Sequence, residues 1–406
     1  MSNNTDNDLS VARRVFAISN PGISSFLYDE VSEFDSTNEN SGCFSDVSLM
    51  RDACFFSGQV NDLVNYLRKG HLAASMHLLL GTAEAVDGLD VNSLLAFKDF
   101  LGLDTNEKGV TLSVSVEGVR GNENRIAICG KVSQNIRDAL KNKCGVESKI
   151  DYKNPQYRFV VYCTEEILGP IEGKSANENK YLLGLKLHSE NLDSRAYRVF
   201  HHKAGYKGAF AAAFLRVLGA KKSSEKLLVC QGRDGMFAIE AALMHNGTDV
   251  REVQKDILEK IPLFVDSFDT ETYEVENGSI EFVKNEDKKV TFVSASSPNV
   301  RSSQSNSKVA NVFDSIRFSK MPLDEYAFNL GNDQFDLAII RLTRKDERDL
   351  NELYYQLSEV LVNGGKALII CRQLLELPVS DRFEEISRGS LLRGHGEHSY
   401  VLVKLI

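Results

Sequence analysis

The sequence predicts an α+β N-terminal part followed by an α/β part with a mostly parallel, doubly wound sheet. Three observations carry this prediction. Up to about residue 187, strands with alternating apolar and polar residues are mixed with helical patterns, whereas from Tyr206 onward short, wholly apolar runs alternate with helices. In addition, 406 residues with 42% hydrophobic and 26% charged side chains can bury more than one core, which excludes fibrous and wholly disordered proteins.

The first unit, residues 13–105, is predicted to be α+β and to follow a disordered polar tail at residues 1–12. Most of its apolar residues have helical spacing, and Asn, Pro and Gly residues form the first turn. The predicted elements are a strand at Val15–Ser19 that ends at Asn20-Pro21-Gly22, and helices at Ile23–Phe34, around Leu63, Leu67 and Leu72, and at Val91–Leu101.

The second unit, residues 106–187, is also predicted to be α+β. Val110–Val119 alternates apolar and polar residues with a period of two, which is typical of a half-buried strand. A helix is predicted at Ser133–Lys143 and a second strand at Tyr157–Cys163. A strand, a helix and a strand with short connections indicate a compact module.

The third unit, residues 206–406, follows a basic linker at residues 188–205. Short apolar runs with helices between them predict a parallel sheet whose ligand crevice lies at the carboxyl ends of the strands. The predicted strands are Lys226–Cys230, Val290–Val293, Phe335–Ile340, Ala367–Cys371 and Tyr400–Leu405, and the predicted helices are Ala209–Leu218, Met236–Met244, Val300–Asn311 and Asp349–Leu361.

The cysteines and the apolar residues exclude several classes of protein. Seven cysteines are scattered without a Cys-x-x-Cys pair, which excludes a disulfide framework and a zinc ribbon. The first residues form no apolar leader, and no stretch approaches the roughly 18 apolar residues of a membrane span. We therefore expect a cytoplasmic protein with no membrane contact.

The net charge of −9 hides an uneven distribution. Residues 174–226 hold eleven Lys and Arg residues against four acids, whereas residues 249–289 hold twelve acids against six bases. The basic segment is a candidate phosphate-contacting surface, and a solvated linker that balances acidic neighbours is the alternative. The acidic insertion at residues 266–289 is expected to be a solvated loop. The alternative is that the acidic segment at residues 249–289 binds a protein partner.

Several segments, in order along the chain, resemble one protein family. Residues 130–136 (GKVSQNI) and 150–155 (IDYKNP) are similar to the late part of a THUMP domain. Residues 192–198 (LDSRAYR) resemble the linker that follows THUMP, and residues 203–206 (KAGY) and 235–242 (GMFAIEAA) resemble two helix starts of the next domain. On these motifs the chain is similar to the THUMP-containing, S-adenosylmethionine-dependent RNA guanine-N2 methyltransferases.

The resemblance implies an N-terminal ferredoxin-like subdomain, a THUMP domain and a Rossmann-like methyltransferase domain. It also implies that the THUMP domain and the linker hold RNA, typically a tRNA near its acceptor end, while the Rossmann-like domain binds S-adenosylmethionine. The basic segment supports the RNA part of this interpretation independently.

The cofactor turn departs from the family pattern. Val229 replaces the acid at the end of the first Rossmann strand, Arg233 replaces the middle glycine, and Gly235 is kept. A glycine lets the backbone approach the cofactor, whereas an arginine brings a cation to the positively charged sulfonium. If cofactor binding is retained, the residues expected to contribute are Gly232, Asp234, Gly235 and Asp336.

Three further sites also differ from the family pattern. In the family, one acid at the end of the second strand binds the ribose hydroxyls, and another after the third strand contacts the adenine amine. Here Ser294–Pro298 contains no carboxylate, and Asp324, the acid nearest to the second site, is displaced. The Asn/Asp-Pro-Pro-Tyr/Phe motif that orients the target base is replaced by Arg341, Leu342, Thr343 and Arg344. Guanidinium groups cannot accept a hydrogen bond from the target amine, so we identify no catalytic residue.

The sequence therefore predicts an RNA-binding protein, with tRNA as the first candidate, whose methyltransferase-like domain is a degenerate pseudoenzyme without a cofactor. Two alternatives stay open: an active guanine-N2 methyltransferase that holds S-adenosylmethionine with relocated ligands, and a protein-interaction scaffold. The sequence also leaves open whether the protein forms a homodimer. The candidate RNA contacts are Arg120, Arg125, Lys131, Lys153, Arg195, Arg198, Lys203 and Lys207.

The histidines do not predict a metal site. His201 and His202 have no cysteine or carboxylate at ligand spacing, so RNA contact is the better interpretation. His395 and His398 are expected in a turn before the last strand.

Overall fold

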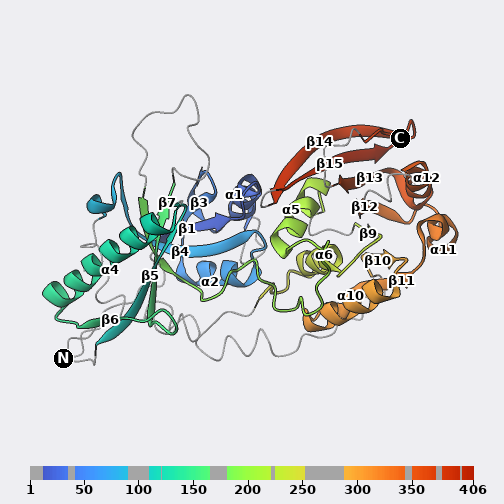
Figure 1. Cartoon of the computed structure of the whole chain (residues 1–406). Helices are drawn as coiled ribbons and strands as arrows, with labels where there is room; N and C mark the ends of the chain where they lie inside the picture. The colour runs from blue at the N-terminus through green and yellow to red at the C-terminus, as the bar shows by residue number, and fades with distance from the viewer. Residues whose placement is uncertain are drawn as a thin grey trace.

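The computed structural model describes residues 12–34, 42–89, 109–119, 121–164, 181–220, 225–251, 288–342, 350–371, 377–393 and 396–406. Within these residues the chain forms two sheets, an eight-stranded one in the N-terminal half and a seven-stranded one in the C-terminal half. Helices α5 (Gly208–Leu218) and α6 (Met236–Asn246) lie between the second sheet and the N-terminal half (Figure 1).

The N-terminal sheet has the strand order β2-β3-β1-β4-β8-β7-β5-β6. Because β4 pairs with β8, strands of the first two predicted units belong to one sheet. Its elements are β1 (Arg13–Ser19), α1 (Ser24–Glu33), β2 (Ser45–Met50), β3 (Ala53–Gly58), α2 (Val60–Lys69), β4 (Ala73–Ala83), β5 (Val110–Glu117), α4 (Asn122–Cys144), β6 (Ser148–Ile150), β7 (Tyr157–Cys163) and β8 (Tyr181–Lys186).

Several N-terminal elements differ from the sequence prediction. Strands β2, β3 and β4 were not predicted, and the helix expected around Leu63, Leu67 and Leu72 ends at Lys69. Most positions of β3 and β4 are buried, so neither strand has the alternation that predicts a half-buried strand. Helix α4 begins at Asn122, well before the predicted start at Ser133. The early start was missed because the first turns of the helix are exposed and lack the apolar periodicity that indicates a helix.

The C-terminal sheet has the strand order β11-β10-β9-β12-β13-β15-β14. The first five strands in this order are parallel to one another, whereas β15 is antiparallel to both of its neighbours, β13 and β14. This mostly parallel sheet confirms the predicted Rossmann-like fold. Its further elements are β9 (Leu227–Cys230), β10 (Val290–Ser294), α10 (Ser297–Val309), β11 (Ile316–Lys320), α11 (Tyr326–Leu330), β12 (Phe335–Arg341), α12 (Leu350–Val360), β13 (Leu361–Cys371), β14 (Phe383–Arg393) and β15 (Gly396–Leu405).

Alternate residues of the C-terminal strands face two different cores. On β9, Leu227 and Val229 pack in the same cluster as α5 and α6, and this cluster continues into the N-terminal half. Leu228 and Cys230 point the other way, into a second cluster with α11 and α12. Burial on both faces explains why these strands are wholly apolar in sequence.

Three further findings complete the comparison with the sequence. Strand β14 and helix α11 were not predicted, and β14 pairs along its length with β15. The helix expected at Val91–Leu101 and almost all of the acidic insertion at residues 266–289 lie outside the described residues. Among the described helices, none combines the length and the apolar character needed to cross a bilayer.

A buried carboxylate joins the two halves and the linker. Glu240, on α6, is fully buried. Its Oε1 accepts hydrogen bonds from Arg195 Nε at 2.6 Å and Tyr197 Oη at 2.5 Å, and its Oε2 lies 2.5 Å from His71 Nδ1. His71 comes from the N-terminal half and Arg195 and Tyr197 from the linker, so one side chain of the Rossmann-like domain holds both. We call these four residues the Glu240 cluster.

The surrounding backbone is shaped to admit this cluster. A Cβ atom at Gly208, the first residue of α5, would collide with Arg195 Nε and Glu240 Oε1. Asp193 Oδ1 accepts the backbone N–H of Ala209 at 2.8 Å, and Asp193 Oδ2 accepts Asn20 Nδ2 at 3.0 Å. The linker is therefore fixed to both halves rather than free.

We expect Glu240→Gln to destabilise the protein strongly. Burial alone would raise the pKa of Glu240, but Arg195 and His71 outweigh it and hold the pKa well below its usual range. Neutralising the carboxylate leaves Arg195 as a buried charge, at a cost of about 3–5 kcal/mol in the free energy of unfolding. Urea denaturation at neutral pH measures this loss.

The control is Glu33→Gln, which removes the exposed Glu33–Arg216 pair at 3.2 Å and should change little. Because the folded pKa of Glu240 is lowered, its contribution is complete above the unfolded pKa of about 4.5 and is lost as the pH falls further. Equal effects of the two substitutions at pH 7 would contradict a central role for the Glu240 cluster.

Candidate functional site

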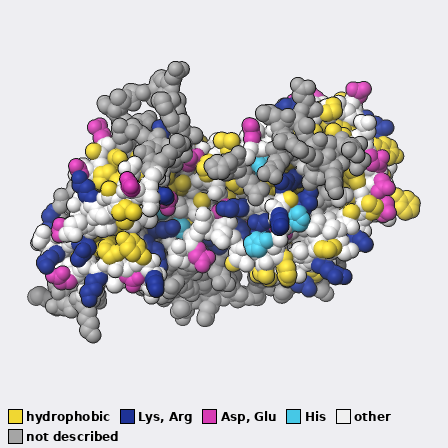
Figure 2. All heavy atoms as spheres, in the orientation of Figure 1, with side chains coloured by type: hydrophobic (Ala, Val, Ile, Leu, Met, Phe, Trp, Pro, Cys, Tyr) yellow, Lys and Arg dark blue, Asp and Glu magenta, His cyan; other side chains and the backbone are white. Residues whose placement is uncertain are grey.

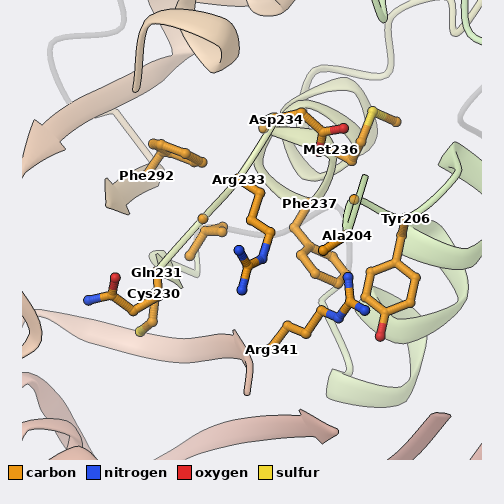
Figure 3. A pocket seen from close by; sticks show the side chains of 14 residues that line it. Ala204, Tyr206, Cys230, Gln231, Arg233, Asp234, Met236, Phe237, Phe292 and Arg341 are labelled. Atoms are coloured by element: carbon orange, nitrogen blue, oxygen red, sulfur yellow. The ribbon is translucent and has the colours of Figure 1, made fainter. Parts of the chain in front are cut away.

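A pocket lies at the carboxyl ends of β9 and β12, where the order of a Rossmann-like sheet reverses and ligands bind. The N-terminus of α6 and the end of the linker close its sides (Figure 3). The residues that line it are Ala204, Gly205, Tyr206, Val229, Cys230, Gln231, Gly232, Arg233, Asp234, Gly235, Met236, Phe237, Phe292 and Arg341.

The turn after β9 is tightly packed. Gln231 has a positive φ of 47°, and Gly235, the residue directly before α6, has a φ of 87°. A Cβ atom at Gly232 would collide with the ring of Phe292, so this ring lies directly against the turn. Burial raises the pKa of the Cys230 thiol, which makes Cys230 a buried apolar residue rather than a nucleophile.

The carboxylate of Asp234 is already bound within the protein. Its Oδ2 accepts hydrogen bonds from Arg198 Nη2 at 2.7 Å, Arg198 Nε at 3.0 Å and the backbone N–H of His202 at 3.2 Å. A Cβ atom at Gly205 would collide with this carboxylate and with Arg198 Nη2. Asp234 therefore holds the linker against the turn.

Arg233 and Arg341 give the pocket a positive charge, and their guanidinium groups point into the same space (Figure 3). The guanidinium carbon of Arg341 lies 4.6 Å from the centre of the Tyr206 ring, a cation–π contact. Arg233 Nε is buried without a hydrogen-bond partner among the described residues. Burial, Arg233, Arg341 and Arg198 together lower the pKa of the neighbouring His202, although Asp234 opposes them.

The residues of the pocket do not fit S-adenosylmethionine. The cavity has a volume of about 20 Å³, room for about one water molecule. Asp234 is the one carboxylate of the lining and is paired with Arg198, so no acid is left for the ammonium or the ribose. Two guanidinium groups line the cavity, and their positive charge would repel a sulfonium cation.

The structure brings three of the four expected cofactor residues together, since Gly232, Asp234 and Gly235 all line the pocket. The prediction for Asp336 is wrong. Asp336 lies at the start of β12, and its Oδ2 accepts the backbone N–H of Lys226 at 2.7 Å. The first residues of a parallel strand lie at the edge of the sheet opposite the ligand crevice, so Asp336 stabilises a strand end instead.

The replaced catalytic motif is only partly described. Arg341 lines the pocket, whereas Leu342 is buried in the core and donates its backbone N–H to the Ile370 oxygen at 2.7 Å. Thr343 and Arg344 lie outside the described residues. The described half of the motif therefore offers a cation and an apolar core residue, neither of which accepts a hydrogen bond from a base.

Two candidate RNA contacts are wrong. Arg195 is buried and bonded to Glu240, and the guanidinium of Arg198 is largely buried against Asp234, so neither is free to meet a phosphate. The carboxylates that bind these two arginines lie some 40 residues away in sequence, so the ion pairs could not be recognised from the sequence alone.

The remaining candidate RNA contacts that the structure describes are exposed or about half exposed. Arg125, Lys153 and Lys203 face solvent. Lys131 pairs with Asp87, and Lys207 Nζ lies 3.5 Å from Asp193 Oδ2, but both side chains are about half exposed. Arg120 lies outside the described residues.

An exposed apolar pair in the linker was missed by sequence reasoning. Val199 and Phe200 are 56% and 50% exposed, next to His201 and Lys203. The backbone N–H and carbonyl of Phe200 are both bound by the side chain of the buried Asn306, each at 2.9 Å. Phe200 directly precedes His-His-Lys in the sequence, and this pattern is the signal that could have indicated the exposed pair.

The histidines hold no metal cluster within the part of the chain that the structure describes. His398 lies in β15 rather than in the expected turn, and its Nδ1 is 2.8 Å from Tyr206 Oη. His395 is outside the described residues, while His201 is exposed and His202 is half-buried.

Comparisons of the structure with solved structures place the whole chain in one fold. A possible methylase from Clostridium difficile 630 has a TM-score of 0.70 at 16% identity, covering 97% of this chain and 98% of that one. SMU.472, a candidate methyltransferase complexed with SAH, has a TM-score of 0.69 at 13% identity and coverages of 96% and 97%. TrmN from Thermus thermophilus has a TM-score of 0.61 at 14% identity and coverages of 98% and 100%.

In sequence, no known protein family and no curated protein matches the chain. The low identities of the solved structures show the fold alone. The chain therefore has a methyltransferase-like fold over its full length, with a β-rich N-terminal part and a Rossmann-like domain.

The positive charge of the pocket can be measured at His202. Because Arg233 lowers the pKa of His202, we expect Arg233→Gln to raise that pKa. NMR titration of the His202 ring resonances measures the change. Arg382→Gln, at an exposed arginine before β14, is the control and should leave the pKa of His202 unchanged. A lower pKa in Arg233→Gln would contradict the charge assignment.

Proposed function

We propose that this protein binds structured RNA through a THUMP domain and a rigid basic linker, and that its methyltransferase-like domain transfers no methyl group. The observation that carries the second half is the arginine-lined pocket, in which Arg233 and Arg341 stand where a cationic cofactor would bind. A guanidinium group repels a sulfonium and cannot accept a hydrogen bond from a base.

The exposed surface supports the first half. Lys, Arg and His side chains gather near the centre of the face shown in Figure 2. Lys203 and Lys207 of the linker can contact phosphates, and the half-exposed ring of Phe200 can stack on an unpaired base. Because Asn306 holds its backbone on both sides, Phe200 loses little freedom on binding.

The preferred RNA is tRNA, as the resemblance of residues 192–198 to the family linker implies. The second candidate is an active methyltransferase, favoured by the full-length likeness to the candidate methyltransferase complexed with SAH. It requires Arg233 and Arg341 to leave the pocket and other residues to supply the missing carboxylates.

Calorimetry separates the two candidates. We expect no heat when S-adenosylmethionine or S-adenosylhomocysteine is added at millimolar concentration to the wild-type protein. The double variant Arg233→Gly, Arg341→Asn removes both cations and should gain measurable affinity, whereas Arg382→Gln should not. Micromolar binding by the wild-type protein, or transfer of a radiolabelled methyl group to tRNA, would establish the enzyme instead.

RNA binding should depend steeply on salt. In a filter-binding assay with tRNA, Lys203→Gln and Lys207→Gln should each lower the affinity and reduce the slope of log K against log salt by about 0.7–0.9. Phe200→Ala should lower the affinity by about 1–3 kcal/mol with the slope unchanged, because stacking releases no counterion.

Lys404→Gln is the control, since Lys404 is exposed on β15 of the C-terminal hairpin. Its affinity and slope should equal those of the wild-type protein. Salt-insensitive binding of tRNA, or no binding at all, would contradict the proposed RNA binding.

A further inference from the structure

A second basic surface lies on helix α10 and strand β11 of the Rossmann-like domain. Residues 288–323 hold six Lys and Arg residues against a single acid, Asp314. Five of the six side chains are exposed and take part in no ion pair within the described part of the chain. These five are Lys288, Arg301, Lys308, Arg317 and Lys320. The one acid leaves most of this positive charge unbalanced.

Three of these cations lie on the side of the sheet that α10 covers. Arg301 and Lys308 belong to α10 itself. Lys320 ends β11 and follows Phe318 by two residues, so both side chains point to the same face of the sheet. Phe318 packs in the core cluster that also contacts Val300 of α10. We call Arg301, Lys308 and Lys320 the α10 surface.

The two cations of the helix form a row. They are seven residues apart, which is about two turns and about 10 Å along a helix, so they leave it on nearly the same side. The buried side of α10 carries Ser303, Asn306 and Ser307 instead. Lys308 Nζ lies 5.0 Å from the centre of the Phe313 ring, a cation–π contact. The helix therefore holds both charges toward solvent.

The α10 surface is continuous with the exposed part of the linker. Asn306 binds the backbone N–H and the carbonyl of Phe200, each at 2.9 Å, so the linker lies against the helix here. At about 100° per residue, the 57% exposed Val309 lies between Asn306 and Lys308 around the helix. Figure 2 shows Lys and Arg side chains over α10. A ligand that crosses the exposed side of α10 would meet the Phe200 ring and then the cations.

The arrangement of these groups selects the kind of ligand. A row of separate cations on an open surface fits an extended polyanion better than one small anion. An RNA strand carries a phosphate at every nucleotide, so successive cations can each meet one. An acidic protein is the other polyanion, but the half-exposed ring of Phe200 offers a stacking surface that suits unpaired bases.

We propose that bound RNA continues from Phe200 across α10 to the end of β11, and that Arg301, Lys308 and Lys320 contact its phosphates. This inference rests on the proposed RNA binding and extends the contact from the linker to the Rossmann-like domain. None of the three cations lines the pocket, so the contact does not depend on whether a cofactor binds there.

The test is filter binding of tRNA to the whole protein over a range of salt concentrations. Arg301→Gln and Lys308→Gln should each lower the affinity and reduce the slope of log K against log salt by about 0.7–0.9. Asp314→Asn removes the one acid of the segment and should raise the affinity. Lys404→Gln is the matched control and should bind as the wild-type protein does.

A double variant tests whether one RNA meets both surfaces. Lys203→Gln combined with Arg301→Gln should reduce the slope by about 1.4–1.8, the sum of the two single effects. The melting temperatures of all variants should equal that of the wild-type protein, because the replaced side chains are exposed. This measurement separates lost contacts from lost folding.

The outcomes distinguish this inference from the proposed function. Weaker binding by Lys203→Gln, with Arg301→Gln and Lys308→Gln equal to the wild-type protein, would overturn the inference and leave RNA binding by the linker intact. Failure of the wild-type protein to bind tRNA would overturn both. Poly-L-glutamate that binds more tightly than tRNA, and is weakened by the same two substitutions, would assign the α10 surface to an acidic protein instead.

Discussion

The arrangement of the molecule depends on one buried negative charge. Glu240 lies on the helix that follows the cofactor turn, and the side chains it holds come from the N-terminal half and from the linker. Since a fully buried carboxylate is tolerated only when it is paired and hydrogen-bonded, the three segments must assemble together around it. The relation between the N-terminal sheet and the pocket follows from this requirement.

The linker motif acquires a structural meaning from the same contacts. Arg195 and Tyr197 bind Glu240, and Arg198 binds Asp234 at the turn, so two of its basic residues are consumed inside the protein. The neighbouring Phe200 and Lys203 are left on the surface. The segment is therefore ion-paired on its inner side and presents a basic and an aromatic side chain on its outer side.

The sequence allowed the Rossmann-like sheet to be predicted well because strands buried on both faces, such as Leu227–Cys230, are wholly apolar and alternate with helices. The β3 strand is buried in a similar way, but it was missed. The turn after β9 was located in the sequence because Gly235 marks it. The roles of Asp336 and Arg195 could not be predicted, since they depend on which end of a strand faces the crevice and on a partner far away in sequence.

Asn306 has a consequence that extends beyond packing. Its side chain binds both backbone groups of Phe200 on the outer surface, and its Nδ2 also donates to the carbonyl oxygen of Asp234 at 2.9 Å inside. One amide therefore links the loop to the turn, and a ligand that displaces the loop must break hydrogen bonds that also hold the turn. Movement of the loop and movement of the turn are therefore not independent, because both break hydrogen bonds made by the same side chain.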